Sequence, residues 1–180
     1  MLEKLGAKTV ELRQLADLTR PLDGIVLPGG ESTVQGKLLR DLGMFEPLRK
    51  RIADGLPVLA TCAGLILLSD KIDNDHEVYF QTLPVTVERN AYGRQLGSFR
   101  AVSEFKGIGA FEMTFIRAPA IRKSEPGVEV LATVGGKSVA VRYENQLALA
   151  FHPEVGRDCR IHSYFLSMVA EAERTSSKAS

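Results

Sequence analysis

Two short apolar segments, each followed by a turn and then by a helical pattern, constrain the fold of this chain more than any other feature. Residues 57–60 (Pro-Val-Leu-Ala) carry no polar side chain on either face, which is typical of a strand buried inside a parallel sheet. Residues 24–27 form a second such segment and stop at a Pro-Gly-Gly turn. Because parallel strands are joined by helical crossovers, this order predicts an α/β domain.

The middle of the chain carries strand signals instead. Its apolar segments are rich in β-branched residues and are separated by Gly, Pro or Asn. Strands are predicted at residues 80–88, 111–117, 128–134, 138–142 and 146–151, with hairpin turns at 134–138 and 143–146. Helical patterns begin near residues 31, 46, 65 and 160. The sequence therefore predicts one three-layer α/β domain over residues 1–180, with a mixed, largely parallel sheet and a flexible tail at about 175–180.

The N-terminal segment departs from the usual order of an α/β domain, which begins with a strand. Residues 1–5 form a helical pattern that stops at Gly6, and the first predicted strand is a short one at residues 9–12. We therefore expect the sheet to lack its usual first strand.

Composition excludes several classes of protein. Apolar residues make up 44% and charged residues 25%, which argues against disordered and low-complexity chains. The net charge of +1 gives no basic excess for a nucleic acid or an anionic membrane. The longest uncharged stretch, residues 55–69, is shorter than the ~20 residues that span a bilayer. The two cysteines cannot build a disulfide framework, so we expect a reducing, cytoplasmic setting.

Cys62 is the sharpest candidate for chemistry. It lies between a buried strand and a helix, among small residues such as Ala63 and Gly64, as a strained strand-to-helix elbow requires. The start of the helix would favour the thiolate, and the backbone N–H of Ala63 could serve an oxyanion. The alternative is that Cys62 is a small core residue, because buried thiols are common.

The Pro-Gly-Gly-Glu-Ser turn at residues 28–32 follows a strand and precedes a helix. Strand carboxyl ends in a doubly wound sheet meet at one edge, where ligands bind, and glycines let backbone N–H groups come close to a ligand. An ordinary turn capped by Ser32 or Thr33 explains the pattern equally well. The turn lacks the Lys-Ser/Thr pair of a phosphate loop.

His152 and Glu154 end a later strand, in the sequence Phe-His-Pro-Glu. A carboxylate two residues after a histidine can hold the imidazole in one tautomer and stabilise its cation. Together with Cys62 they would form a Cys-His-Glu triad. The alternative is a surface histidine beside a turn proline.

Residues 89–95 (Arg-Asn-Ala-Tyr-Gly-Arg-Gln) could grip a carboxylate through arginine contacts, or could form a surface loop with scattered charge. A metal site is not predicted, because Cys159, His162 and the other histidines supply no closed set of four ligands.

Five segments, in this order along the chain, resemble the glutaminase subunits of pyridoxal 5′-phosphate synthase, which are class I glutamine amidotransferases. They are the motifs at residues 28–33, 60–64, 89–95, 115–119 and 151–154. The Gly-Gly-Glu-Ser and His-Pro-Glu pieces occur in wider amidotransferases, whereas Arg-Asn-Ala-Tyr-Gly-Arg-Gln and Phe-Ile-Arg-Ala-Pro are specific. The resemblance covers nearly the whole chain and implies a flavodoxin-like, three-layer α/β/α fold.

The resemblance also implies roles for individual residues. Cys62 matches the nucleophile, and His152 and Glu154 match the other members of the triad. Gly30 and Ala63 match the oxyanion donors. The implied glutamine-binding residues are Gly29, Gly30, Glu31, Arg89, Ile116 and Arg117. No cofactor is implied.

The implied reaction is hydrolysis of L-glutamine to glutamate and ammonia through a glutamyl thioester. The ammonia would pass to a synthase subunit that builds pyridoxal 5′-phosphate, in a large assembly on a dodecameric core. Relatives begin with a short apolar strand and a Leu-Gln-Gly turn, before the helix that here starts at Met1. We expect the absence of that strand to weaken the sheet and the oxyanion hole.

Two other functions stay open from the sequence. The chain could be a different cysteine hydrolase of the same fold, such as a peptidase or a chaperone-like relative. It could also be an interaction subunit that the missing first strand leaves inert.

Overall fold

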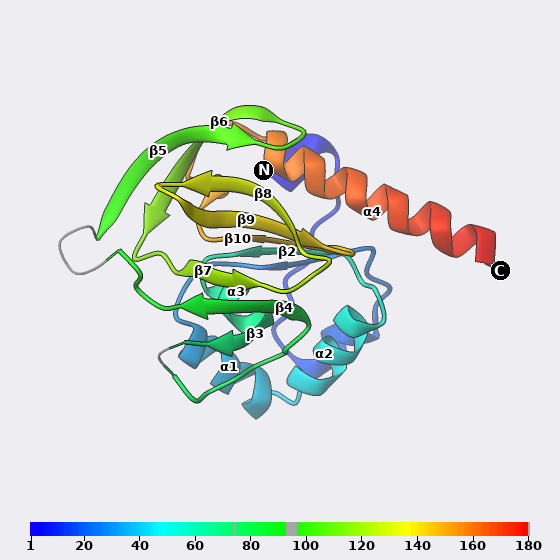
Figure 1. Cartoon of the computed structure of the whole chain (residues 1–180). Coiled ribbons are helices and arrows are strands. Elements are labelled where there is room, and N and C mark those ends of the chain that lie inside the picture. The colour runs from blue at the N-terminus through cyan, green and yellow to red at the C-terminus, as the bar shows by residue number, and fades with distance from the viewer. Residues whose placement is uncertain (74, 93–96, 180) are drawn as a thin grey trace.

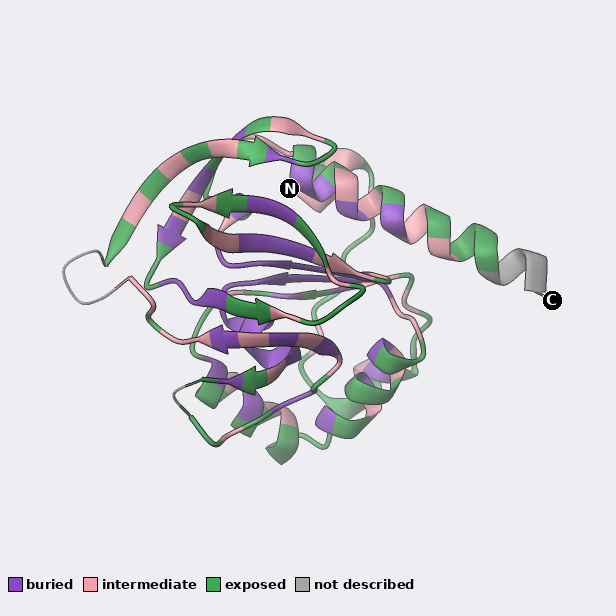
Figure 2. Ribbon diagram, viewed as in Figure 1, coloured by how far each residue is buried: buried purple, intermediate pink, exposed green. Residues whose placement is uncertain are grey.

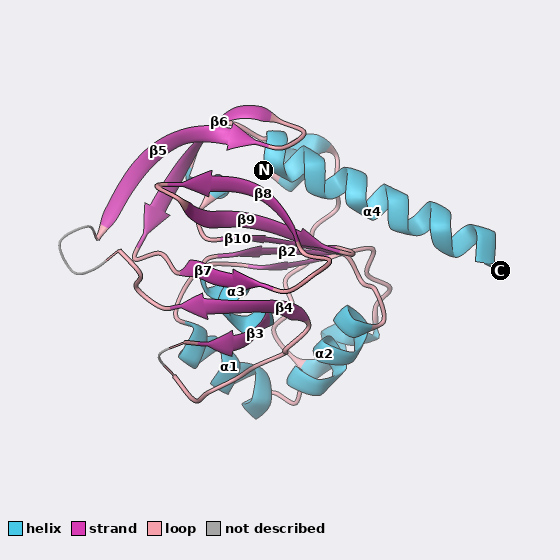
Figure 3. Ribbon diagram, viewed as in Figure 1, coloured by secondary structure: helices cyan, strands magenta, loops and turns pink. Residues whose placement is uncertain are grey.

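The structure is a computed structural model that describes residues 1–73, 75–92 and 97–179. Its strands form one mixed sheet, and helices lie on both sides of this sheet (Figures 1 and 3). The α-helices are α1 (Ser32–Asp41), α2 (Phe45–Ala53), α3 (Ala63–Leu68) and α4 (Arg160–Ala179), and the 3-10 helices are η1 (Leu2–Leu5), η2 (Leu15–Thr19) and η3 (Pro153–Val155). The strands are β1 (Ile25–Leu27), β2 (Val58–Thr61), β3 (Ser69–Ile72), β4 (Leu83–Glu88), β5 (Ser98–Phe105), β6 (Gly109–Ile116), β7 (Ala120–Ser124), β8 (Glu129–Val134), β9 (Lys137–Tyr143) and β10 (Gln146–Leu149).

The main path of the sheet runs in the order β1-β2-β10-β9-β7-β4-β3, with β5, β6 and β8 forming a side branch. The two predicted buried strands, β1 and β2, lie side by side and are parallel, and β10 pairs in parallel with the other edge of β2. The predicted α/β class and mixed sheet are confirmed. Parallel pairing among the described residues is limited to β1–β2, β2–β10 and β3–β4, and the other pairs are antiparallel.

Antiparallel pairing in the middle follows from its tight connections. The two predicted hairpins are present, with Val134 opposite Lys137 and Tyr143 opposite Gln146. A two-residue turn joins antiparallel neighbours, whereas a parallel neighbour needs a longer crossover.

The core surrounds β2, β10 and α3 (Figure 2). Every residue of these three elements is buried, including Thr61 and Gln146. Helix α3 packs on β1, β2 and β10, and α1 packs on α3 from outside. A short helix that is apolar all round is stable only inside such a core. No helix in the described part of the chain is long and apolar enough to cross a membrane.

The predicted strand at residues 9–12 is wrong, because these residues form no regular secondary structure. Residues 7–13 and 24–28 are among the residues that line a cavity of about 1120 Å³. A strand needs a neighbour for its backbone hydrogen bonds, and among the described residues β1 pairs with β2 and no strand pairs with residues 9–12. Among the described residues, the path of the sheet starts at β1.

Three strands have no counterpart in the sequence prediction: β3, β5 and β7. Half of the residues of strand β5 are exposed, but the strand pairs with β6 over its whole length, from Ser98 opposite Ile116 to Phe105 opposite Gly109. Its conformation is therefore set by a backbone ladder and not by an apolar pattern. At the other end of the chain, α4 continues to Ala179, beyond residue 174 where the apolar pattern ends.

Candidate active site

Neighbouring strands bring the candidate residues Cys62 and His152 together. Leu149, the last residue of β10, pairs with Thr61, the last residue of β2. The backbone N–H of Cys62 donates to the carbonyl of Leu149 at 2.8 Å, so the chain positions after the two strands stay in register. Both candidates therefore lie at the carboxyl edge of the parallel part of the sheet, as the sequence predicts.

Cys62 has a strained backbone, with φ 48° and ψ −99°. A residue with a side chain rarely adopts this conformation, and such strain concentrates at functional sites. The residue is 7% exposed, and its Sγ lies 3.9 Å from the carbonyl oxygen of Ile116. Gly64 makes the elbow possible, because a Cβ at that position would lie 2.1 Å from the carbonyl oxygen of Leu27.

His152 is fixed from both its backbone and its ring. Its N–H donates to the carbonyl of Thr114 at 2.8 Å, and its Nδ1 lies 2.8 Å from Oε1 of Glu154. Hydrogen bonds with Cys62 and then Glu154 outweigh burial and raise the pKa of His152 to about 10. A ring that stays protonated at neutral pH can stabilise negative charge on the adjacent sulfur.

Glu154 is the charged partner of this ring. Burial raises the pKa of the Glu154 carboxyl, but the hydrogen bond from His152, a backbone N–H and the charges of His152 and His162 together hold it below its usual value. His162 is buried on α4, and its Nδ1 has no hydrogen-bond partner. Burial, followed by the charge of the chain's N-terminus, lowers the pKa of His162, whereas Glu154 acts in the opposite direction.

The glycine turn packs directly against the imidazole. A Cβ on Gly29 would lie 2.3 Å from Cε1 of His152, so only glycine fits this position without displacing the ring. Gly30 has φ 140°, a conformation that favours glycine. Ala63, the other candidate oxyanion donor, is the first residue of α3 and is buried next to Cys62.

The remaining predicted residues lie in two groups around this turn. Glu31 forms an ion pair with Arg117 at 3.5 Å, and Arg117 follows Ile116 in a left-handed conformation with φ 45°. Arg89 donates to Thr33 Oγ1 at 3.3 Å. These contacts bring the ends of β4 and β6 to the N-terminus of α1.

Arg89 has two further partners that the sequence did not indicate. Its Nη2 donates to Tyr79 Oη at 3.0 Å, and its Nη1 lies 3.0 Å from Asp75 Oδ2. Both partners lie in the segment between β3 and β4, for which the sequence gives no periodic signal. Residues 93–95 of the predicted arginine loop lie outside the described residues. In the described ranges, no group of three or more Cys, His, Asp or Glu is placed to hold a metal ion.

Fold and site together define a class. A cysteine on a strained elbow, beside a histidine and a carboxylate from the adjacent strand, on a mixed α/β sheet, is the arrangement of the glutamine amidotransferase class. Comparison with known families agrees. The chain belongs to the SNO glutamine amidotransferase family, whose sequence profile matches residues 1–171.

Individual relatives are closely similar over most of their length. The chain is 56% identical to the "Pyridoxal 5'-phosphate synthase subunit PdxT" of Desulfitobacterium hafniense (strain Y51), covering 96% of this chain and 87% of that protein. It is 55% identical to the protein of the same name from Methanocorpusculum labreanum, covering 94% and 89%. A solved structure titled "Crystal structure of glutamine amidotransferase" superposes with a TM-score of 0.88 at 42% identity, covering 94% and 90%.

Proposed function

We propose that this chain is the glutaminase subunit of a pyridoxal 5′-phosphate synthase and that Cys62, His152 and Glu154 hydrolyse the side-chain amide of L-glutamine. Membership of the SNO glutamine amidotransferase family supports the reaction class, and relatives named as synthase subunits support the assignment to that complex. The single observation that carries the catalytic assignment is the strained Cys62 elbow beside a histidine held by Glu154.

The proposed reaction follows from these positions. The sulfur of Cys62, its proton held by His152, attacks the amide carbon, and the carbonyl oxygen becomes an oxyanion. Backbone N–H groups of Gly30 and Ala63 stabilise that charge, which is where most of the electrostatic gain of such reactions arises. His152 then gives its proton to the leaving nitrogen, so that ammonia departs and a glutamyl thioester remains. Water, deprotonated by His152, attacks the thioester and releases glutamate and the thiol.

The residues around the turn suit the rest of the substrate. Arg89 and Arg117 supply positive charge for the α-carboxylate, and Glu31 supplies negative charge for the α-amino group. Gly29 and Ile116 complete the lining of the site through their backbones. Contacts to these distant groups hold the amide at the sulfur, so that binding energy serves orientation.

Ammonia would be wasted if it were released into water, where it is protonated at neutral pH and no longer nucleophilic. We propose that a synthase subunit receives it through a channel, in an assembly on a dodecameric core, and that the site is fully ordered only in that complex. The free thiols of Cys62 and Cys159 favour a reducing, cytoplasmic location.

The test is glutamine-dependent ammonia release, measured with and without the synthase subunit. We expect the complex to be active and Cys62→Ala to reduce its rate by roughly 10⁶-fold, as removal of a triad nucleophile does. Cys159→Ala is the matched control and should keep the wild-type rate. A glutamine-mimicking electrophile should label Cys62 alone, and glutamine should protect it. A complex whose ammonia release equals that of Cys62→Ala would favour an inert subunit, and labelling that glutamine does not slow would favour a peptidase.

A further inference from the structure

Gln35 is a polar residue of α1 that no motif singled out, and it contacts the glycine turn directly. Its Nε2 donates to the carbonyl of Pro28 at 3.2 Å and to the carbonyl of Gly29 at 3.2 Å. Both partners are acceptors, so only the NH₂ side of the amide can face them. The other atom of the amide, Oε1, is buried without a hydrogen-bond partner. The side chain therefore holds its orientation at a cost, because its own acceptor stays unpaired.

This contact determines which way the next peptide group points. The described chain contains no cis peptide bond, so the Gly29–Gly30 peptide is trans. In a trans peptide the C=O and the N–H point in opposite directions. Because the carbonyl of Gly29 points to Gln35, the N–H of Gly30 points away from α1. The ring of His152 packs against Gly29, where a Cβ would lie 2.3 Å from Cε1, so the turn is held between Gln35 and the catalytic histidine.

Two adjacent glycines could otherwise let this peptide rotate. Gly30 already has φ 140°, and glycine crosses between conformations with little steric hindrance. A rotated peptide would present the carbonyl of Gly29, a partial negative charge, where an oxyanion needs a donor. A preorganised donor avoids this reorganisation during the reaction.

We propose that Gln35 is a positioning residue that fixes the Gly29–Gly30 peptide with the Gly30 N–H available to the oxyanion. This inference rests on the proposed glutaminase function of the site. It assigns the oxyanion geometry to a side chain on α1 and not to the turn alone.

The test compares Gln35→Leu and Gln35→Glu with the matched control Lys37→Leu, which lies on the same helix and forms an exposed ion pair with Asp41. Glutamine-dependent ammonia release is measured in the complex with the synthase subunit. We expect kcat to fall by roughly 10²-fold in Gln35→Leu, as loss of one oxyanion donor does, with KM changed less than about twofold. Gln35→Glu should fall further, because a carboxylate repels both carbonyls. Lys37→Leu should keep the wild-type values.

Two further readouts separate positioning from general damage. Alkylation of Cys62 by iodoacetamide should proceed at the wild-type rate in Gln35→Leu, because that reaction needs no oxyanion donor. The backbone amide resonance of Gly30, followed by NMR, should move in both Gln35 variants and stay in Lys37→Leu. An unchanged kcat in Gln35→Leu, or a fall in kcat matched by slower alkylation, would overturn the proposal. If the wild-type complex releases no ammonia, the glutaminase function fails, and an unmoved Gly30 resonance would still refute the role of Gln35.

Discussion

The two ends of strands β2 and β10 differ in how completely their polar groups are paired, although a left-handed backbone also occurs at the amino end, at Glu144 with φ 50°. At their carboxyl end the chain accepts strain and leaves polar atoms unpaired. Cys62 and Arg117 have left-handed backbones, and buried atoms of Gln35, Arg89 and His162 have no hydrogen-bond partner. Each of these features costs free energy, of order 1–3 kcal/mol for a strained backbone or for an unpaired buried group.

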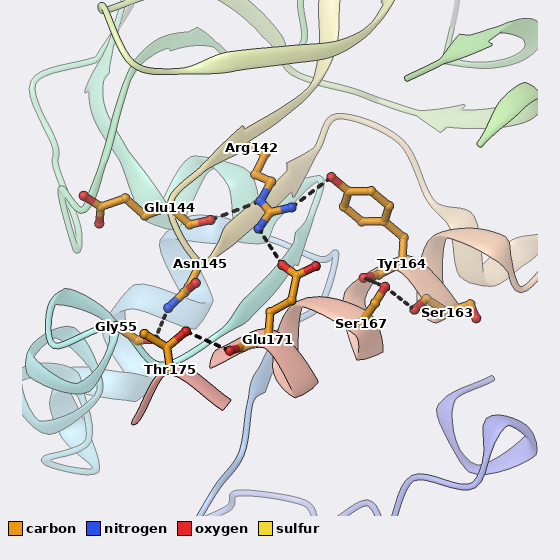
Figure 4. Close-up of polar contacts among 9 residues, drawn as sticks. All are labelled: Gly55, Arg142, Glu144, Asn145, Ser163, Tyr164, Ser167, Glu171 and Thr175. Atoms are coloured by element: carbon orange, nitrogen blue, oxygen red, sulfur yellow. Dashed lines mark hydrogen bonds and ion pairs between the residues drawn. The ribbon is translucent and has the colours of Figure 1, made fainter. Parts of the chain in front are cut away.

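At the amino end of the same strands the polar groups are satisfied (Figure 4). Arg142 donates to the carbonyl of Glu144, to Tyr164 Oη and to Glu171 Oε2, each at 3.2 Å. Asn145 donates to the carbonyl of Gly55 at 2.7 Å and so joins the start of β10 to the loop before β2. This Arg142 cluster pins helix α4 to the sheet.

Gln146 continues the same pattern inside the core. Its Oε1 accepts a hydrogen bond of 2.9 Å from the Thr82 hydroxyl, and its Nε2 donates one of 2.9 Å to the Thr82 carbonyl. The comparison indicates that the two ends of one sheet differ in what they contribute to the protein. The amino end supplies stability through paired groups, and the carboxyl end uses part of that stability to hold reactive groups in costly positions. The following predictions test this difference between the two ends of the sheet.

The largest effect is expected from Gly29→Ala at the carboxyl end. The new methyl group would overlap the His152 ring, whose displacement by about 1 Å should lower kcat by roughly 10²-fold. Ammonia release by the complex measures this. Gly97→Ala is the control, because a Cβ there meets nothing within 4 Å, and it should stay at the wild-type rate. Equal activity of the two variants would show that the ring position is not critical.

At the amino end, the substitution Arg142→Leu should affect stability and not activity. It removes three hydrogen bonds and should lower the free energy of unfolding by about 1–2 kcal/mol, since each net bond contributes about 0.5–1.5 kcal/mol and the cluster is partly exposed. The activity of the folded protein should be unchanged. Urea unfolding measures the first value, and ammonia release the second. Arg100→Leu, which breaks an exposed ion pair with Glu112, should cost less than about 0.5 kcal/mol.

Strain at Cys62 can be measured by comparing two substitutions. Glycine tolerates φ 48°, whereas alanine does not, so Cys62→Gly should be more stable than Cys62→Ala by about 1 kcal/mol. At Ala172, inside α4, glycine should instead be less stable than alanine by a similar amount. Urea midpoints of the four proteins decide the question. If alanine were more stable than glycine at both positions, the result would argue against backbone strain at Cys62.

A further prediction concerns the pH dependence of stability. The pKa of His152 is raised from 6.5 when unfolded to about 10 when folded, so the folded state binds its proton more tightly. The stabilisation is therefore complete below about pH 6.5 and is lost as pH rises toward 10. The stability difference between wild type and His152→Asn should shrink across this range. A difference that grows with pH in urea titrations would contradict the assigned hydrogen bonds.

The sequence by itself determined the elements whose signals are local. The two apolar strands with their turns and the hairpins after β8 and β9 were readable, because each depends on a few neighbouring residues. The candidates Cys62, His152 and Glu154 were marked by local motifs in the same way, and their catalytic role stays a prediction. Tertiary structure alone decided the rest. Residues 9–12 have strand-forming side chains but no neighbouring strand, whereas β5 has a weak pattern and a complete partner in β6.

Dependence on tertiary packing also explains why the sequence did not indicate three residues near the candidate site. Gln35, Tyr79 and His162 are ordinary residues of a helix, a loop and a helix, and nothing in their local sequence marks them. They lie at the site because packing brings α1 to the glycine turn, Tyr79 to Arg89 and α4 close to Glu154. Local sequence sets backbone conformation, but hydrogen bonds between distant segments exist only once the core has formed.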